Sequence, residues 1–231
     1  MTGPLDPQAL SEIPIFRSLT TGELNRLTSV LRSKTFPADT NIINADQPGE
    51  TVYVIRSGTV KVHADQPDGS NVILAILGPG EVIGEIGAFD RVGRSASVVT
   101  MEPCSLCWMD FAAFSEAVQV MPQLALNLLS VMARRLRLAD AHIQALASLD
   151  VYGRVAHQLL TLAGEYGEKG SNGDILIPVR LTQGDLADFI GATRVRVNQV
   201  LNDYKDQGLL SIDGNYHFII NRWDALAQRV R

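Results

Sequence analysis

The chain has 231 residues, of which 46% are hydrophobic and 19% are charged, enough to build one or two ordinary hydrophobic cores. No apolar run reaches the roughly 18 residues that a membrane-spanning helix needs. The first residues also lack the basic and apolar regions of a signal peptide, so we expect a cytoplasmic protein without a membrane partner. The net charge of −5 argues against non-specific binding of polyanions by the whole molecule. The segment from Asp150 onward is close to charge balance, so a nucleic-acid surface there must be a local patch.

Short β-strands are the first elements that the sequence predicts. Between Val52 and Val62, two β-rich runs flank a turn that contains Gly58. A second turn at residues 67–69 is followed by another apolar run, at residues 72–77. The pattern predicts a β domain in the first half of the chain.

A cassette that combines glycine, one carboxylate and one guanidinium follows these strands. The backbone amides after Gly84 can point into a concavity, and a helical turn at Ile86 would present its positive end to an anion. Arg94 offers a planar fork of donors suited to phosphate oxygens, and Ser95 adds a hydroxyl. Glu85 would repel a phosphate, so we expect it to accept from a ribose 2′-hydroxyl and to orient Arg94 through its charge. The cassette therefore has the chemistry to hold a ribose phosphate, and a Gly-rich loop with a surface ion pair is the alternative.

Four motifs occur in order around this cassette. They are Pro48-Gly49-Glu50, a Y-x-I-x-x-G-x-V run that starts at Tyr53, Gly78-Pro79-Gly80-Glu81 and the cassette itself, G-E-I followed by R-S-A. Together they resemble the cyclic-nucleotide-binding β-roll of the catabolite activator (cyclic AMP receptor protein) family, and the resemblance extends over nearly the whole chain. It implies an α+β fold with a jelly-roll-like β-roll over residues 1–120, and cyclic AMP as the ligand with cyclic GMP as an alternative. The ligand-binding residues that we expect are Gly84, Glu85, Ile86, Arg94, Ser95, Ala96 and Asp140.

Two cysteines, Cys104 and Cys107, form a lone C-x-x-C around a segment, residues 105–109, that we interpret as the last strand of the roll. A metal or cluster site needs more ligands, and no histidine or further cysteine lies near them in the sequence. Residues three apart on a strand point to opposite faces, which favours two structural thiols over a redox pair. We expect no metal site and, since no catalytic constellation is found, no enzyme.

A long helix is predicted from residue 121, where Pro122 suits a first turn, and residues 121–149 are expected to form a dimerisation helix and hinge. Apolar residues with alternating spacings of four and three form a coiled-coil seam at Ala125, Leu129, Met132, Leu136, Ala139, Ile143 and Leu146. A second row that could cover the roll comprises Leu124, Leu128, Val131, Leu138, Ala145 and Leu149. A single buried helix is the alternative, but the family resemblance at residues 132–136 favours a homodimer.

The segment at residues 149–154 resembles the hinge of the family, with Asp150 able to cap the next helix by accepting from its free amides. Helical apolar spacing continues through residues 155–163. Residues 166–174 contain three glycines and no periodicity, so we expect a solvated linker there. In relatives a surface loop near this place touches RNA polymerase, and the resemblance therefore implies the polymerase as a partner.

A helix-turn-helix is predicted in the last third of the chain. Thr182 can cap a first helix, Gly191 lies at the turn, and Thr193 can cap a second helix. The segments at residues 209–212 and 216–220, joined by a turn with a glycine, predict a β-hairpin. Together these elements resemble a winged helix.

The N-terminal residues of the second helix in such a motif enter the major groove of DNA. Arg194 can donate two hydrogen bonds to a guanine edge, Gln199 could read an adenine, and Val195 offers apolar contact to a thymine methyl. Thr193 and Arg196 are more suitable for phosphate contacts, although arginines here could also be solvated helix charges. The DNA-binding residues that we expect are Thr182, Thr193, Arg194, Val195, Arg196 and Gln199.

The sequence also departs from the catabolite activator. Where the activator has Arg-Glu-x-x-x-Arg in its recognition helix, this chain has Arg194, Val195 and Gln199, so the TGTGA half-site of the activator is not expected. The Arg-Val pair instead resembles nitrogen-control regulators of cyanobacteria, which read a GTA-like half-site. The Thr-Ser pair of the family that meets adenine aligns with Ala139-Asp140, and Asp140 could alternatively pair with Arg137 on the helix surface.

The sequence therefore predicts a homodimeric transcription regulator. It would bind a cyclic nucleotide in the roll, bind double-stranded DNA at a near-palindromic operator through winged helices at residues 150–231, and control RNA polymerase recruitment. One alternative is an effector-independent regulator that keeps the roll as a scaffold. Another is a cyclic-nucleotide-controlled module that acts on another protein.

Overall fold

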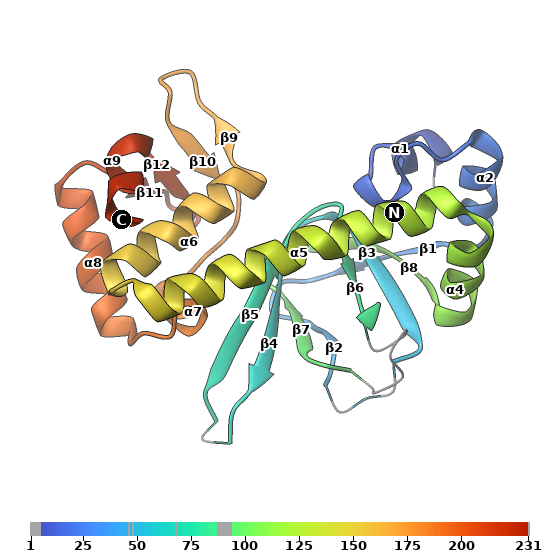
Figure 1. Ribbon diagram of the computed structural model, residues 1–231, viewed down its shortest axis with the longest axis horizontal. Helices are drawn as coiled ribbons and strands as arrows, with labels where there is room; N and C mark the ends of the chain where they lie inside the picture. Colours follow the sequence, from blue (N-terminus) through green and yellow to red (C-terminus); the bar gives the residue numbers. More distant parts are fainter. Residues whose placement is uncertain (1–5, 46, 48, 68, 87–93, 231) are drawn as a thin grey trace. The chain divides into compact units, whose positions relative to one another are not determined.

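The computed structural model describes residues 6–45, 47, 49–67, 69–86 and 94–230 (Figure 1). The chain divides into two compact units, of which the first comprises Met1–Asp65 and Leu74–Leu136 and the second Gln66–Ile73 and Arg137–Arg231. The boundary falls within the long helix α5 (Pro122–Ser148), which contributes its N-terminal half to the first unit and the rest to the second. Within the part of the chain that the structure describes, no helix combines the length and the apolarity needed to cross a membrane.

Two four-stranded sheets form the roll of the first unit (Figure 1). One sheet has the order β1-β8-β3-β6, with the strands Arg32–Phe36, Cys104–Asp110, Thr51–Ser57 and Val82–Ile83. The other has the order β2-β7-β4-β5, with the strands Asn41–Ile43, Ser97–Thr100, Val60–Asp65 and Asn71–Leu77. The expected β-roll and the α+β class are confirmed.

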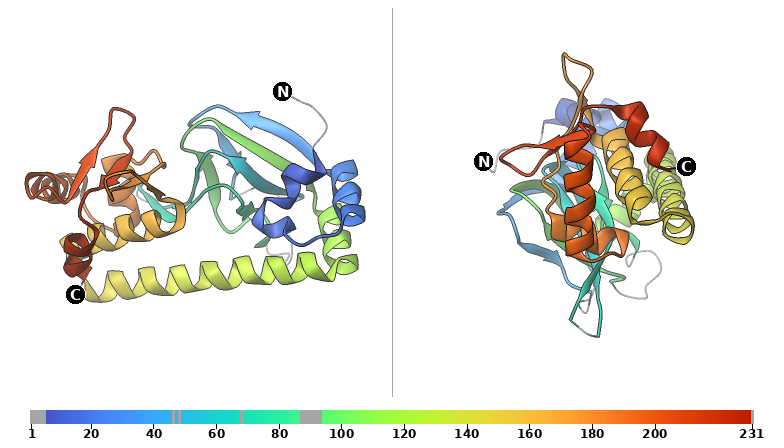
Figure 2. Two further views of the ribbon diagram at one scale, coloured as in Figure 1. Left: turned by 90° about the horizontal axis from the view of Figure 1, so that it is seen from above. Right: turned by 90° about the vertical axis from the view of Figure 1, so that its left-hand side faces the viewer.

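The alternation of side chains along the central strands β3 and β8 separates two hydrophobic cores, because successive residues of a strand point to opposite faces. One core lies between the sheets and includes Phe36, Ile43, Ile55, Val60, Leu77, Ile83, Val98 and Leu106. The other includes Val52, Val54 and Met109 and is covered by helices α1 (Pro7–Ser11), α2 (Thr21–Val30), α4 (Phe111–Val120) and the first turns of α5. Figure 2 shows these helices gathered beside the N-terminal end of α5. Between α1 and α2 lies the short 3-10 helix η1 (Pro14–Phe16).

The two cysteines belong to different cores, as predicted from their spacing on one strand. Cys104 packs between the sheets, and Cys107 packs against the helices. Both thiols are free, and burial raises the pKa of each to about 11. No group of three metal-ligating side chains occurs among the described residues. The pair therefore contributes to packing, and its geometry does not support a redox pair.

The second unit contains the predicted helix-turn-helix, formed by α7 (Gln183–Ile190) and α8 (Arg194–Asp206) beside α6 (Val151–Tyr166). The hairpin of β11 (Leu210–Ile212) and β12 (Phe218–Ile220) follows α8, and the chain continues into α9 (Trp223–Ala227) and the 3-10 helix η2 (Gln228–Val230). The buried side chains of this unit include Val155, Leu159, Leu186, Ile190, Val197, Val200, Leu201, Tyr204 and Phe218. The expected winged helix is confirmed.

The segment that was expected to be a solvated linker is partly a β-hairpin. The strands β9 (Glu168–Lys169) and β10 (Ile175–Ile177) pair with each other, and β10 also pairs with β12, which gives a sheet of order β11-β12-β10-β9. Two-residue strands carry no readable periodicity, and the pairing between β10 and β12 joins segments about forty residues apart. The pattern around the glycines alone therefore could not predict this extension.

Local capping contacts fix the ends of these helices as the sequence predicted. The carboxylate of Asp150 accepts from the amide of Gly153 at 2.8 Å, and the hydroxyl of Thr193 accepts from the amide of Arg196 at 3.3 Å. Thr182 forms a capping box with Asp185. Gly191 ends α7 with a φ of 63°, in the left-handed region that favours glycine.

Arg154 ties the ends of two helices together inside the second unit. Its Nε and Nη2 donate to the carbonyls of Leu149 and Leu146 at 3.0 Å, at the C-terminal end of α5. Its Nη1 donates to the carbonyl of Ile190, the last residue of α7, at 3.4 Å. One guanidinium thus satisfies carbonyls that a helix terminus leaves without an intrahelical partner.

Helix α5 buries one of its two predicted apolar rows and exposes most of the other. Leu124, Leu128, Val131 and Ala145 of the second row are buried. In the seam, Leu129 and Leu136 are each 64% exposed and Ile143 is 63% exposed. Ala125, Met132 and Leu146 are partly buried, so the exposed stripe centres on the three large residues spaced by seven.

Candidate functional sites

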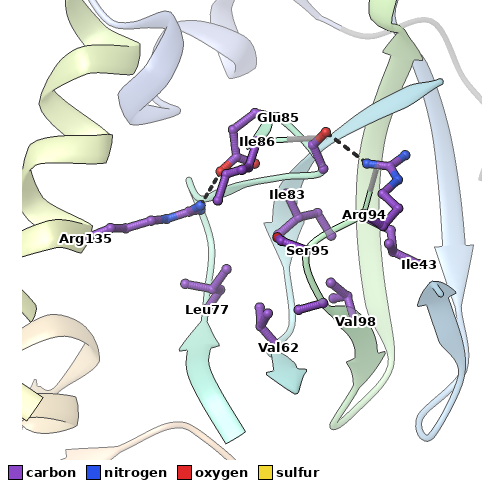
Figure 3. A pocket seen from close by; sticks show the side chains of 12 residues that line it. Ile43, Val62, Leu77, Ile83, Glu85, Ile86, Arg94, Ser95, Val98 and Arg135 are labelled. Atoms are coloured by element: carbon purple, nitrogen blue, oxygen red, sulfur yellow. Dashed lines mark hydrogen bonds and ion pairs between the residues drawn. The ribbon is translucent and has the colours of Figure 1, made fainter. Parts of the chain in front are cut away.

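A pocket of about 390 Å³, part of it open to solvent, lies in the first unit where β6, β7 and the cassette meet (Figure 3). Its apolar wall consists of Ile43, Val62, Leu77, Ile83 and Val98. Six of the seven residues predicted to bind ligand line it, namely Gly84, Glu85, Ile86, Arg94, Ser95 and Ala96. The middle of the cassette, residues 87–93, lies outside the described residues. The sequence therefore predicted a set of residues that line one pocket, and their contacts decide what the pocket can bind.

Gly84 allows Arg94 to lie against the backbone of the roll. Its φ is 84°, and a Cβ there would lie 2.8 Å from the carbonyl oxygen of Thr51 and would overlap the Arg94 guanidinium. With no side chain in the way, Nη1 of Arg94 donates to the carbonyl of Gly84 at 2.9 Å and Nη2 donates to that of Thr51 at 2.8 Å. Burial lowers the pKa of Arg94, and the nearby Tyr53 and Glu85 oppose this shift.

Glu85 is buried, with 3% of its side chain exposed, and its carboxylate pairs with Nη1 of Arg135 on α5 at 2.7 Å. Burial raises the pKa of Glu85, and the charge of Arg135 is the largest opposing effect. We expected Glu85 to orient Arg94, but the contacts differ, because backbone carbonyls hold Arg94 and Arg135 holds the carboxylate. Figure 3 shows that the side chains of Glu85 and Arg94 point in different directions. The charge of Glu85 reaches Arg94 only as a minor contribution to its pKa.

Arg135 is a site residue that the sequence reasoning missed. Besides Glu85 it contacts Glu81, whose carboxylate accepts from Nε at 2.9 Å and from Nη2 at 2.7 Å, and Nη2 also donates to the carbonyl of Val82. Arg134 pairs with the same Glu81, which is 3% exposed. Buried carboxylates need such partners. The signal in the sequence was the pair Arg134-Arg135 within the helix that was predicted to cover the roll. Its partners, Glu81 and Glu85, are acids in the glycine motifs of the roll.

Asp140 is the one predicted ligand residue that does not line the pocket. It is exposed on α5, one turn from Leu136 along the exposed stripe. The alternative interpretation, an ion pair with Arg137, does not occur between these two described residues.

The residues predicted to bind DNA gather at the N-terminal end of α8. Thr193, Arg194, Val195, Arg196 and Gln199 are all exposed, and Val195 is 70% exposed. The opposite side of the helix is anchored by the fully buried Val197, Val200 and Leu201. A rigid helix thus presents a mixed cationic, amide and methyl surface.

A groove beside α8 includes further residues that the sequence reasoning did not name. The cations Arg180, Arg194 and Lys205 line it together with Thr182, Gln183 and one acid, Asp213. On the wing, the guanidinium of Arg180 lies 5.6 Å from the ring centroid of Tyr216. Three cations against one acid make this groove locally positive, although the net charge of the chain is −5.

Arg196 was expected to contact phosphate or to be a solvated helix charge, and in the structure it has two partners. Its Nη1 donates to Oε1 of Gln199 at 3.1 Å, and its guanidinium lies 5.4 Å from the ring centroid of Tyr152. Tyr152, in the first turn of α6, is a second residue that the sequence reasoning missed, because its distance of more than forty residues from Arg196 leaves no local signal.

Comparison with known proteins finds one matching family model for the β-roll and another for the winged helix. The family model "Cyclic nucleotide-binding domain" matches residues 33–120, and the family model "Crp-like helix-turn-helix domain" matches residues 153–229. The CRP-like cAMP-activated global transcriptional regulator of Mycobacterium tuberculosis is 33% identical over 224 residues, which cover 97% of this chain and 99% of that protein. The cAMP-activated global transcriptional regulator CRP of Pasteurella multocida is 32% identical over 180 residues, or 78% of this chain and 85% of that protein.

Among solved structures, FixK2 from Bradyrhizobium japonicum has a TM-score of 0.76 at 22% identity and covers 87% of this chain and 98% of its own. At that identity the likeness shows the fold alone. The relative from Mycobacterium tuberculosis covers almost the whole chain, and both sequence relatives are transcription regulators. The β-roll, the winged helix and these matches together show that the chain belongs to the CRP family of cyclic-nucleotide-binding, DNA-binding transcription regulators.

Proposed function

We propose that the protein is a homodimer whose affinity for a near-palindromic operator is controlled by cyclic AMP bound in the pocket of the first unit. The observation that carries the proposal is the pocket itself, in which an apolar wall meets Arg94, Ser95 and Glu85. A cyclic nucleotide has the matching parts, a flat base and a sugar phosphate. The names of the relatives, which are cAMP-activated regulators, support cyclic AMP over cyclic GMP.

The donor set fits a ribose phosphate. A guanidinium has five N–H groups, and the carbonyls of Gly84 and Thr51 take one from each of two nitrogens of Arg94, which leaves donors for a phosphate. Ser95 adds a hydroxyl and the backbone from Gly84 to Ile86 adds amides, while the small Ala96 leaves room beside them. One carboxylate oxygen of Glu85 is held by Arg135, so the other can accept from the ribose 2′-hydroxyl.

Asp140 is assigned to the base in this proposal. A carboxylate accepts from the amino group of adenine, and it also pairs with the two adjacent donors of guanine, so we expect a modest preference for cyclic AMP.

The exposed stripe of α5 supports the dimer. Burying a large aliphatic side chain is worth about 1.5–3 kcal/mol, and Leu129, Leu136 and Ile143 form one row with a seven-residue repeat. A second copy of the same stripe is a self-complementary partner, as two-fold symmetry requires. A two-fold dimer would bind two half-sites of opposite orientation.

On the DNA, Arg194 is assigned to a guanine edge and Val195 to a thymine methyl, with Gln199 as the third base-reading residue. Thr182, Thr193 and Arg196 are assigned to the phosphate backbone, where contacts fix register without reading sequence. Recruitment of RNA polymerase is part of the proposal, and the hairpin of β9 and β10, in the region where the family resemblance places the polymerase contact, is the surface to test.

Calorimetry with ligand-free protein tests the effector. Wild-type protein should bind cyclic AMP, and Arg94→Leu should weaken binding by roughly 10- to 150-fold, because a charge-assisted hydrogen bond is worth about 1.5–3 kcal/mol. Arg56→Leu, which removes an exposed arginine of β3, is the matched control and should bind normally. If the wild type shows neither heat nor a thermal shift with millimolar cyclic AMP or cyclic GMP, the protein is an effector-independent regulator.

Selection from randomised DNA, with and without cyclic AMP, tests the rest. We expect two-fold symmetric sites with a guanine preference in each half-site, selected more strongly when cyclic AMP is present. Arg194→Ala should flatten that preference at a cost of about 1–3 kcal/mol. Arg196→Ala should lower affinity for all sequences and reduce the salt dependence of binding. Single sites without symmetry would contradict the dimeric binding mode.

A further inference from the structure

Tyr152 contacts the recognition helix α8 at several points along its length. Its hydroxyl donates to the carboxylate of Asp203, and its carbonyl accepts from the hydroxyl of Tyr204 at 2.9 Å. Its ring meets the ring of Tyr204 edge-on, with centroids 5.8 Å apart and an interplanar angle of 79°. The guanidinium of Arg196 lies over the same ring. Because Tyr204 is fully buried, this end of α6 holds Tyr152 firmly against α8.

The contact between Arg196 and Gln199 fixes the orientation of an amide. Arg196 has donors and no acceptor, so the atom of Gln199 that faces it must be the carbonyl oxygen, as the 3.1 Å distance between Nη1 and Oε1 records. The amide nitrogen of Gln199 must then point elsewhere. Arg196, Gln199 and Asp203 are spaced by three and four residues, so they share one face of α8, beside which Tyr152 lies.

This orientation changes what Gln199 can read. Two-point recognition of adenine needs the amide oxygen and the amide nitrogen both turned to the base edge. In this structure the oxygen is turned toward Arg196, which takes one of its two lone pairs, whereas the N–H groups of the amide remain to donate. A lone donor matches acceptors of the major groove, which are N7 and O6 of guanine, N7 of adenine and O4 of thymine.

We propose that Tyr152 is a positioning residue that, through Arg196, turns the amide of Gln199 so that it donates to a base-edge acceptor and does not recognise adenine at two points. The proposal rests on the proposed function, in which the N-terminal end of α8 enters the major groove. It replaces the expectation that Gln199 reads adenine and gives Arg196 a role in base recognition besides its contact with phosphate. Cytosine, which offers a donor at this place in the groove, is the base that the wild type should reject most strongly.

The first experiment is selection from randomised DNA by the full-length wild type and by Gln199→Ala. The base position whose preference the alanine variant flattens is the one that Gln199 reads. The proposal expects cytosine to be rejected there and adenine to gain no advantage over guanine or thymine. A preference for adenine over guanine of more than about tenfold at that position would overturn it, since a bidentate pair supplies discrimination of that size.

The decisive variant is Gln199→Glu, which is isosteric. One carboxylate oxygen keeps the contact with Arg196, and the other replaces the amide nitrogen, so a donor becomes an acceptor at the same place. The preference should then invert toward cytosine, whose amino group donates to carboxylates, with a change in the base ratio of about tenfold or more.

Gln207→Glu is the matched control. Its amide oxygen accepts from Nη2 of Arg229 at 2.6 Å, so the same Arg–Gln arrangement occurs just beyond the C-terminal end of α8. This variant adds the same negative charge to the same unit, and it should lower affinity for all sequences alike without changing any base preference.

Variants of Tyr152 test the positioning role. Tyr152→Leu removes the ring beneath Arg196 and should raise the relative selection of adenine at the Gln199 position severalfold. Tyr152→Phe keeps the ring under Arg196 and loses only the hydroxyl contact with Asp203, so it should keep the wild-type base preference. A changed preference in this variant would assign the effect to the hydroxyl and not to the ring. If Tyr152→Leu does not fold, Arg196→Met frees the amide from the other side and should shift the preference in the same way.

The outcomes separate the two proposals. A wild type that selects no DNA sequence contradicts the proposed function and this inference with it. A wild type that selects symmetric sites overturns the inference alone if Gln199→Glu leaves every base preference unchanged, or if Tyr152→Leu and Arg196→Met both leave the relative selection of adenine unchanged.

Discussion

Replacement of Arg135 by methionine should destabilise the first unit strongly, because this guanidinium serves two buried carboxylates. Glu81 and Glu85 each have 3% of their side chains exposed, and Arg135 itself is 20% exposed. Methionine keeps the length of the aliphatic part of the side chain and removes the charge and all donors. Arg135→Met therefore tests the ion pairs separately from packing.

The expected magnitude follows from the contacts. Breaking a buried ion pair by removing one partner costs about 3–5 kcal/mol, because the remaining charge stays buried. Glu81 keeps Arg134 as a partner, so the lower end, about 3 kcal/mol, applies. For a chain of this length that corresponds to a fall in Tm of roughly 6–12 °C.

The loss should depend on pH in a defined direction. Burial already raises the pKa of Glu85 in the wild type, and the variant lacks the arginine that opposes this shift. A carboxyl group whose pKa is raised by folding favours the folded state while it is protonated. Its stabilising contribution is complete below the unfolded pKa of about 4.3 and is lost as the pH rises through the folded pKa. The deficit of Arg135→Met should thus be smallest near pH 4.5 and largest above pH 7.

Urea denaturation across this pH range measures the deficit directly. Arg137→Met, which removes an exposed arginine two residues further along α5, is the control and should stay within about 0.5 kcal/mol of the wild type. A deficit below roughly 1 kcal/mol, the usual size for an exposed pair, would refute the reasoning, and so would a deficit that does not change with pH.

Three further outcomes follow from the structure. Leu136→Glu should convert the proposed dimer to a monomer in sedimentation experiments, and a dimer that survives the change would place the interface elsewhere. Asp140→Ala should weaken binding of cyclic AMP in calorimetry and reduce the difference in affinity between cyclic AMP and cyclic GMP. Unchanged affinity for both nucleotides would remove Asp140 from the site. Cys104 and Cys107, each with a pKa of about 11, have only about one thiol in several thousand ionised at pH 7.5, so native protein should react with maleimide far more slowly than unfolded protein. Rapid labelling of the native state would show that the strand between the two cores opens.

Features that depend on neighbouring residues could be predicted from the sequence. The caps at Asp150, Thr182 and Thr193 need only a side chain and the amides that follow it, and the structure shows all three. The opposite faces of Cys104 and Cys107 follow from the period of two in a strand. The pocket residues were predicted because the cassette is nearly continuous in sequence.

Contacts between distant elements were beyond sequence reasoning. The pairing of Glu85 with Arg135 joins positions fifty residues apart, and nothing in the helical pattern says which polar side chain meets the roll. The same holds for Tyr152, whose partners on α8 lie more than forty residues away. In each case the local pattern was compatible with a solvated surface, and only packing shows that the charge has a defined partner.

The clamp formed by Arg154 has a mechanical consequence. It holds the last turn of α5 and the end of α7, and the ring of His142 on α5 lies 4.9 Å from that of Phe189 on α7. A bending motion between the last turns of α5 and α7 would have to break these contacts together, so we expect the segment from His142 to Leu149 to resist bending. The terminal segment of α5 is thus joined to the helix-turn-helix through Arg154 and through the ring contact, and we expect the two to move as one body. Amide exchange in this segment should therefore follow that of α7 and not that of the first turns of α5.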